Sequence, residues 1–80
     1  MLENEINDVR RTLSDNIKVL RKELGLAQER LALEAGVDRT VVSKIERRIS
    51  NPSLDILVKL AIVLKVPVSD LLRFDKFEPH

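Results

Sequence analysis

Apolar residues recur at intervals of three and four along most of this 80-residue chain, and glycine or proline interrupts the pattern at four places. Such spacing is typical of amphipathic helices, and no stretch sustains the alternation of a half-buried strand. Gly25 and Gly36 each follow an apolar run, where a glycine in the left-handed conformation commonly ends a helix. Pro52 and Pro67 mark the other two breaks. We therefore predict an all-α chain of five helices.

Most helix ends can be placed from single residues. Asp38 is a suitable N-cap for the third helix and Ser53 for the fourth, because their side-chain oxygens can accept from free backbone N–H groups. The fourth helix carries a predicted apolar stripe of Leu54, Leu57, Leu60, Ala61 and Leu64. We expect the five helices to end at about Leu24, Ala35, Arg47, Leu64 and Leu72 or Arg73.

The start of the first helix is open to two interpretations. Its apolar residues Leu13, Ile17, Leu20 and Leu24 are preceded by Leu2, Ile6 and Val9 at the same spacing. This continuity favours one long helix. The pair Ser14-Asp15 could instead cap a fresh start, which would leave a separate helix at the N-terminus.

Length and composition exclude several classes of protein. Residues 1–80 suffice for one small domain, whose core we expect within residues 13–73. The chain has no cysteine and no Cys/His cluster, so neither a disulfide nor a metal site is expected. No apolar run approaches the ~20 residues of a membrane span, and the acidic N-terminus is unlike a secretory signal. We predict a cytoplasmic protein without a cofactor or a membrane partner.

Charge is distributed unevenly although the net charge is only +1. The middle of the chain is basic, with most of its Lys and Arg residues between Lys18 and Arg48. Acidic residues gather at both ends, in Glu3, Glu5 and Asp8 and again in Asp70, Asp75 and Glu78. This pattern suggests one face for a polyanion such as DNA and another that faces away. A mixed solvated surface is the alternative.

Residues 28–47 contain two predicted helices joined by a tight turn at Gly36. Small residues on the second helix, Ala32 and Ala35, allow the two helices to approach closely. On a helical wheel the third helix has one apolar stripe, and the opposite sector collects Arg39, Thr40, Ser43, Lys44 and Arg47. This layout is typical of a helix-turn-helix that places one helix in the DNA major groove. The alternative is an ordinary solvated helix face.

The same segment resembles a known family. The motif is similar to the phage repressor and Cro (XRE-type) helix-turn-helix family in Gln28-x-x-Leu31-Ala32-x-x-Ala35-Gly36-Val37-x-Arg39-x-x-Val42-Ser43-x-Ile45-Glu46-Arg47. The resemblance covers roughly residues 13 to 73 and implies a compact five-helix domain of the lambda-repressor-like type. The run from Asp38 to Arg47 is most similar to the controller proteins of restriction–modification systems.

The resemblance implies a role for individual residues. Base contacts would come from Arg39, Thr40, Ser43 and Lys44. Val41 would either pack on the core or meet a thymine methyl group. Phosphate contacts would come from Gln28, Arg47 and Arg48. Gln28 could also brace a side chain of the third helix. Arg21 and Glu46 would form a partly buried ion pair between the first and third helices.

Three positions depart from the family pattern. Ala27 precedes the second helix, where a capping Ser, Thr or Asn is common. Pro67 likewise supplies no side-chain cap to the fifth helix. Arg48 stands where a glycine commonly follows the third helix, so we expect the chain to reverse there through a different conformation.

The expected partners are double-stranded DNA and a second copy of the chain. A single recognition helix reads only a few base pairs, and related proteins double the site by forming symmetric dimers. The apolar surplus near the C-terminus is the predicted dimer interface: Val66, Val68, Leu72, Phe74 and Phe77. The N-terminal residues Leu2, Ile6 and Val9 can add to it, whereas Leu71 should cover the core of its own subunit.

The sequence thus predicts a homodimeric, sequence-specific transcriptional regulator that binds a near-palindromic operator, such as a restriction–modification controller protein. Alternatives are an antitoxin or other protein-interaction module with the same fold, or a phage-type repressor. An enzyme is disfavoured because the one histidine is His80 and no glycine-rich phosphate loop is present. No small-molecule ligand is evident.

Overall fold

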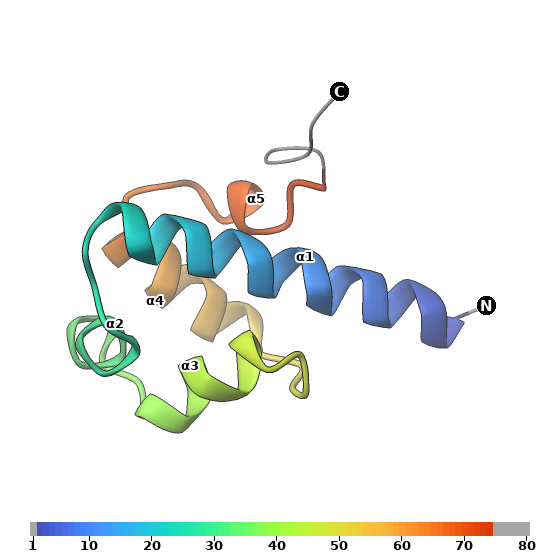
Figure 1. The fold of residues 1–80 in the computed structure, drawn as a ribbon, viewed down its shortest axis with the longest axis horizontal. Helices are drawn as coiled ribbons and strands as arrows, with labels where there is room; N and C mark the ends of the chain where they lie inside the picture. The colour runs from blue at the N-terminus through green and yellow to red at the C-terminus, as the bar shows by residue number, and fades with distance from the viewer. Residues whose placement is uncertain (1, 75–80) are drawn as a thin grey trace.

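The computed structural model describes residues 2–74, which form five α-helices and no strand (Figure 1). The helices are α1 (Leu2–Glu23), α2 (Gln28–Ala35), α3 (Arg39–Glu46), α4 (Leu54–Leu64) and α5 (Val68–Leu71). The predicted all-α, five-helix fold is confirmed. Helix α5 is shorter than expected: it ends at Leu71, whereas the predicted end was Leu72 or Arg73.

The N-terminal segment belongs to α1, which runs without interruption for 22 residues. The long first helix is therefore the correct alternative, and the pair Ser14-Asp15 caps nothing. Ser14 lies in the middle of the helix with its side chain fully buried, where its hydroxyl is used in a contact with α3. The first half of α1 projects beyond the other helices (Figure 1).

The core is formed by apolar side chains from all five helices. Its buried members are Leu13, Ile17, Leu20, Leu31, Ala32, Val42, Ile45, Leu57, Leu60, Ala61, Leu64 and Leu71. Leu71 covers the core of its own chain, as expected. Leu54 was wrongly assigned to the stripe of α4, because it occupies the first position of the helix and is 73% exposed.

The helix ends follow local chemistry. Gly25 and Gly36 adopt φ values of 69° and 72°, the left-handed conformation expected of glycines that end helices. The hydroxyl of Ser53 accepts a hydrogen bond from the backbone N–H of Ile56 at 3.2 Å. Ala27 and Pro67 provide no side-chain cap, as predicted.

One buried amide attaches the short helix α5 to α1. The side-chain nitrogen of Asn16 donates toward three backbone carbonyl oxygens, those of Asp70 at 3.2 Å, Leu71 at 2.9 Å and Arg73 at 3.0 Å. The carbonyls of Asp70 and Leu71 belong to the last turn of α5, and that of Arg73 follows the helix. Asn16 was not anticipated from the sequence, although an asparagine between Leu13 and Ile17 falls on the buried side of α1.

Candidate nucleic-acid interface

The turn between α2 and α3 is closed by backbone hydrogen bonds. The N–H of Gly36 donates to the carbonyl of Leu33 at 3.2 Å, and the N–H of Val37 donates to that of Ala32 at 3.0 Å. Val37 then packs against the core. This arrangement ends α2 abruptly and sets the direction in which α3 begins.

Asp38 caps the first turn of α3, as predicted. Its Oδ1 accepts from the backbone N–H of Thr40 at 3.0 Å and from the Thr40 hydroxyl at 2.9 Å. The backbone hydrogen bond, followed by the hydroxyl bond, lowers the pKa of the Asp38 carboxyl from its ordinary value. Arg39 and Lys44 lower this pKa further by smaller electrostatic effects. The cap is therefore favoured in its ionised form.

The two faces of α3 differ in character. Val42 and Ile45 are buried in the core. Arg39, Thr40 and Lys44 are exposed, and the other polar side chain of this face, Ser43, is half-buried. The helix thus presents polar and basic side chains outward from a rigid apolar base. Such a face can donate to bases and attract phosphates.

Val41 lies at the border of this face. It is half-buried and packs against the core, so packing accounts for part of its side chain. The remainder of the side chain is accessible from outside.

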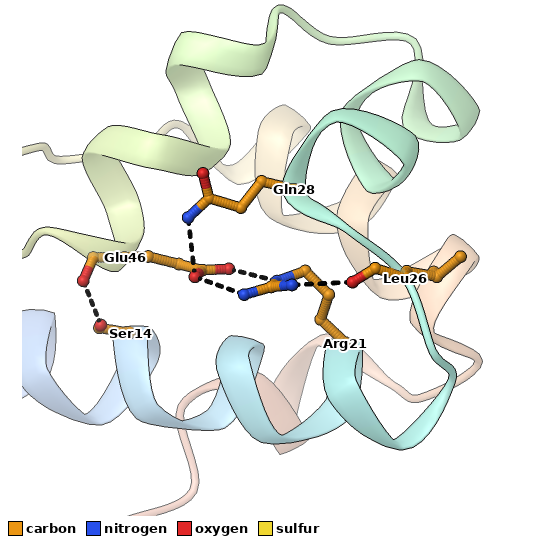
Figure 2. A network of polar contacts seen from close by, with 5 residues as sticks. All are labelled: Ser14, Arg21, Leu26, Gln28 and Glu46. Atoms are coloured by element: carbon orange, nitrogen blue, oxygen red, sulfur yellow. Dashed lines mark hydrogen bonds and ion pairs between the residues drawn. The ribbon is translucent and has the colours of Figure 1, made fainter.

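A polar cluster around Glu46 holds the end of α3 (Figure 2). Arg21 forms the expected ion pair, with Nε 2.8 Å from Oε2 and Nη2 2.9 Å from Oε1. Arg21 also donates through Nη1 to the carbonyl of Leu26 at 2.8 Å. The side chain of Gln28 donates to Glu46 Oε1 at 3.0 Å, so Gln28 braces α3 from α2. Both oxygens of the buried carboxylate are therefore used.

Ser14 completes the cluster from the middle of α1. Its hydroxyl donates to the backbone carbonyl of Glu46 at 2.8 Å (Figure 2). This carbonyl belongs to the last residue of α3, so no backbone N–H of the helix donates to it. This contact was not anticipated from the sequence. The sequence feature that could have indicated it is a serine next to Leu13, within an uninterrupted helical spacing of apolar residues.

Arg48 ends α3 in an unexpected way. It adopts a left-handed conformation with φ of 64°, and its N–H donates to the carbonyl of Ile45 at 3.0 Å. The N–H of Ile49 donates to the carbonyl of Lys44 at 3.1 Å. The prediction of a different conformation at Arg48 was therefore wrong, since arginine takes the shape that glycine would take. The cost of this left-handed conformation is offset by the two hydrogen bonds, which form when Arg48 adopts it.

Two of the candidate DNA-binding arginines have acidic neighbours that were not anticipated. Arg48 Nη2 lies 3.2 Å from an oxygen of Asp15, and Arg39 Nη1 lies 3.6 Å from an oxygen of Glu29. All four side chains are well exposed, so these pairs are weak and can exchange for a phosphate or a base. Within residues 2–74, Lys44 and Arg47 make no ion pair.

The predicted dimer residues fall into two groups. Leu72 and Phe74 are 40% and 61% exposed. Val66 and Val68 are half-buried and pack against the core, so part of their surface serves the monomer. Phe77 lies outside the described residues.

In the described part of the chain, no group of His, Cys, Asp and Glu side chains is arranged to hold a metal ion. None of the helices within residues 2–74 is long and apolar enough to cross a membrane.

Comparison with known proteins identifies relatives of this fold. A family model described as helix-turn-helix, HTH_3, matches residues 17–71. A hypothetical transcription factor from Neisseria meningitidis is 40% identical over 65 residues, which are 81% of this chain and 61% of that protein. The crystal structure of a hypothetical transcription factor, NHTF, from Neisseria has a TM-score of 0.80 and 38% identity, and the match covers 85% of this chain and 78% of that one.

Two further relatives have more specific descriptions. Control protein C.BamHI from Bacillus amyloliquefaciens is 36% identical over 69 residues, which are 85% of each chain. The structure of SinR from Bacillus subtilis in complex with DNA has a TM-score of 0.73 and 42% identity, over 76% of this chain and 98% of that one. This chain spans about three fifths of the Neisseria relative's length. The matched residues contain the whole α2–turn–α3 unit, and the chain therefore belongs to the XRE-type helix-turn-helix (HTH_3) family of transcriptional regulators.

Proposed function

We propose that this chain is a sequence-specific DNA-binding regulator that acts as a homodimer on a near-palindromic operator. The observation that carries the proposal is the outer face of α3, where exposed Arg39, Thr40 and Lys44 stand on a helix locked by Glu46. A relative solved with DNA, SinR, supports the same use of the fold. Such a regulator works in the cytoplasm and needs neither a cofactor nor catalytic residues.

Bases would be read by Arg39, Thr40, Ser43 and Lys44. Arg39 suits a bidentate contact to guanine O6 and N7, for which it must leave Glu29. The Thr40 hydroxyl already donates to Asp38, so its oxygen remains free to accept from an amino group such as adenine N6. The accessible part of Val41 would meet a thymine methyl group.

Phosphates would be held on either side of this reading face. Arg47 and Arg48 follow α3, and a phosphate would replace Asp15 as the partner of Arg48. Gln28 uses one N–H to hold Glu46, and its amide carries a second N–H that can donate to a phosphate at the start of α2. Gln28 would then couple DNA contact to the position of α3.

The dimer would double the reading face. We place the interface on the exposed surface of Leu72 and Phe74, with the accessible parts of Val66 and Val68, and with Phe77. A two-fold axis would set the two copies of α3 about 34 Å apart, one turn of DNA, so that they enter adjacent major grooves.

The proposed subclass is a restriction–modification controller protein. The observation in favour is the match to control protein C.BamHI, which extends over 85% of both chains. The exposed apolar residues Leu72 and Phe74 would equally suit an antitoxin or another protein-interaction module.

The test is a binding titration with duplexes selected from a random-sequence pool. We expect selection of a two-fold symmetric site, tighter binding to it than to a scrambled duplex by about a thousandfold or more, and a loss of affinity as salt rises. Equal affinity for the selected and the scrambled duplex at physiological salt would refute sequence-specific binding.

A further inference from the structure

The first half of α1, residues 2–12, contains no buried side chain and projects beyond the other helices (Figure 1). Its apolar residues Leu2 and Val9 are 69% and 53% exposed, and Ile6 is half-buried. Its apolar side is therefore available for packing against another surface.

A groove of about 450 Å³ runs along that side of α1. It is mainly apolar and is lined by, among others, Ile6, Val9, Leu13, Pro52, Leu57 and Leu72. Leu72 belongs to the surface proposed for the dimer. The groove therefore joins the projecting half of α1 to that surface and forms one continuous apolar area with it.

A glutamate and an arginine line the same groove and do not form an ion pair with each other. Glu5 makes no ion pair with any residue in the range 2–74. Among residues 2–74, the guanidinium of Arg10 donates to the side-chain amide oxygens of Asn51 at 2.8 Å and Asn7 at 3.2 Å and makes no ion pair. The groove thus carries one acidic and one basic group on the same helix.

We propose that a second copy of this chain occupies the groove, with its own α1 packed antiparallel to the first. Leu2, Ile6, Val9 and Leu13 follow one another by steps of four and three, the spacing of a helix that pairs with another helix. If Ile6 faces the partner's Val9 in antiparallel order, Glu5 falls opposite the partner's Arg10. A two-fold axis then forms this ion pair twice.

Charge selects this arrangement over a parallel one. Glu3, Glu5 and Asp8 precede Arg10 and Arg11 along α1, so parallel helices would bring like charges together. The loop that follows α3 lies close to the projecting half of α1, because Arg10 bonds to Asn51 in that loop. Antiparallel pairing would therefore bring the two loops near the axis and hold both copies of α3 on one side of the dimer.

The inference rests on the proposed homodimer and specifies its contact surface. Sedimentation equilibrium of the full chain should show that Val9→Glu weakens self-association by at least about a hundredfold, because it buries a charge in the groove. The matched control is Leu33→Glu, where the leucine is 70% exposed on α2, a helix at the opposite end of the molecule from the projecting half of α1 (Figure 1). This control should leave the dimer unchanged.

Charge reversal tests the orientation independently of any effect on folding. Glu5→Arg alone and Arg10→Glu alone should each weaken the dimer by about tenfold, since each creates two like-charge contacts across the axis. The double variant E5R/R10E should restore self-association to within about threefold of the original. Circular dichroism should show the same helix content in all variants.

The outcomes separate this inference from the proposed function. Val9→Glu should keep its affinity for a single half-site and lose the preference for the two-fold symmetric site. A dimer that persists in Val9→Glu, or a double variant that is no better than the single ones, would overturn the antiparallel contact and leave the operator-binding dimer intact. A chain that remains monomeric on its symmetric site would overturn both.

Discussion

Arg21 of α1 and Glu46 at the end of α3 form a bidentate ion pair, with nitrogen–oxygen distances of 2.8 and 2.9 Å. The side chain of Arg21 is 12% exposed and that of Glu46 is 3% exposed. Gln28 donates to the same carboxylate from α2. Because a buried pair gains little net stability after desolvation, its main effect is to fix α3 relative to both neighbouring helices.

Removing one partner of this pair should be costly. Glu46→Ala leaves the guanidinium of Arg21 nearly buried without its counter-charge, and we expect the free energy of unfolding to fall by about 3–5 kcal/mol. Urea denaturation measures the change. The control is Glu34→Ala, which breaks an exposed pair with Arg30 and should cost less than about 1 kcal/mol. Similar losses in the two variants would contradict the structural role.

Asn16 should be required for the attachment of α5. Asn16→Ala removes the donor to the carbonyls at the end of α5 and should lower the free energy of unfolding by about 1–3 kcal/mol. Hydrogen exchange of the α5 amides should accelerate more than that of α2. The exposed Asn4→Ala is the matched control. An unchanged exchange rate in α5 would show that the amide contacts are dispensable.

The conformation of Arg48 predicts opposite effects on stability and binding. Arg48→Gly removes the arginine side chain and relieves the strain of the left-handed conformation. Arg48→Ala also removes the arginine side chain but keeps this strain. We expect the glycine variant to be more stable than the alanine variant by about 1 kcal/mol in urea denaturation. Both should bind DNA more weakly, because the phosphate contact proposed for the Arg48 side chain would be lost. Equal stability of the two variants would contradict the strain.

The cap of α3 should weaken in acid. Because the folded-state pKa of Asp38 is lowered, the stability gained from the ionised carboxylate is complete above the ordinary aspartate pKa. This stability is lost as the pH falls from the ordinary aspartate pKa through the lower pKa of Asp38 in the folded state. D38N keeps a capping side chain that does not titrate. The stability of the wild type relative to D38N should therefore decrease over this window, and a constant difference would argue against the shift.

Arg39 and Arg47 should contribute to DNA binding in different ways. Arg39→Ala should reduce discrimination at one base pair by about 1–3 kcal/mol and affect other positions little. Arg47→Ala should weaken binding to every duplex alike and lower the salt dependence by about one ion. Titrations against the selected site and its single-base variants measure both effects. Identical specificity profiles for the two variants would contradict the assigned roles.

Local chemistry explains why α2, the turn and α3 could be predicted. A glycine in the left-handed conformation, a capping aspartate and the spacing of Val42 and Ile45 each act within a few residues. Their positions in the sequence therefore decide the structure at Gly36 and Asp38 without knowledge of distant segments. The polar face of α3 follows from the same spacing.

The features that the spacing of apolar residues did not predict depend on burial and on particular hydrogen bonds. The sequence leaves Ser14 open as a helix cap or as part of one long helix, and its hydroxyl in fact meets a carbonyl 32 positions away along the chain. Leu54 fits the spacing of α4, yet no other helix covers it. Arg48 accepts a strained conformation because Ile45 and Lys44 supply the acceptors that end α3.

The amino-acid sequence by itself determined the helices, their caps and the polar face of α3, since each depends on neighbours one or two turns away. Only the tertiary structure decided that α1 is continuous, that Ser14 and Gln28 hold Glu46, and that Asn16 secures α5. Those features depend on burial, because a polar side chain enclosed by several helices must find its partners among them.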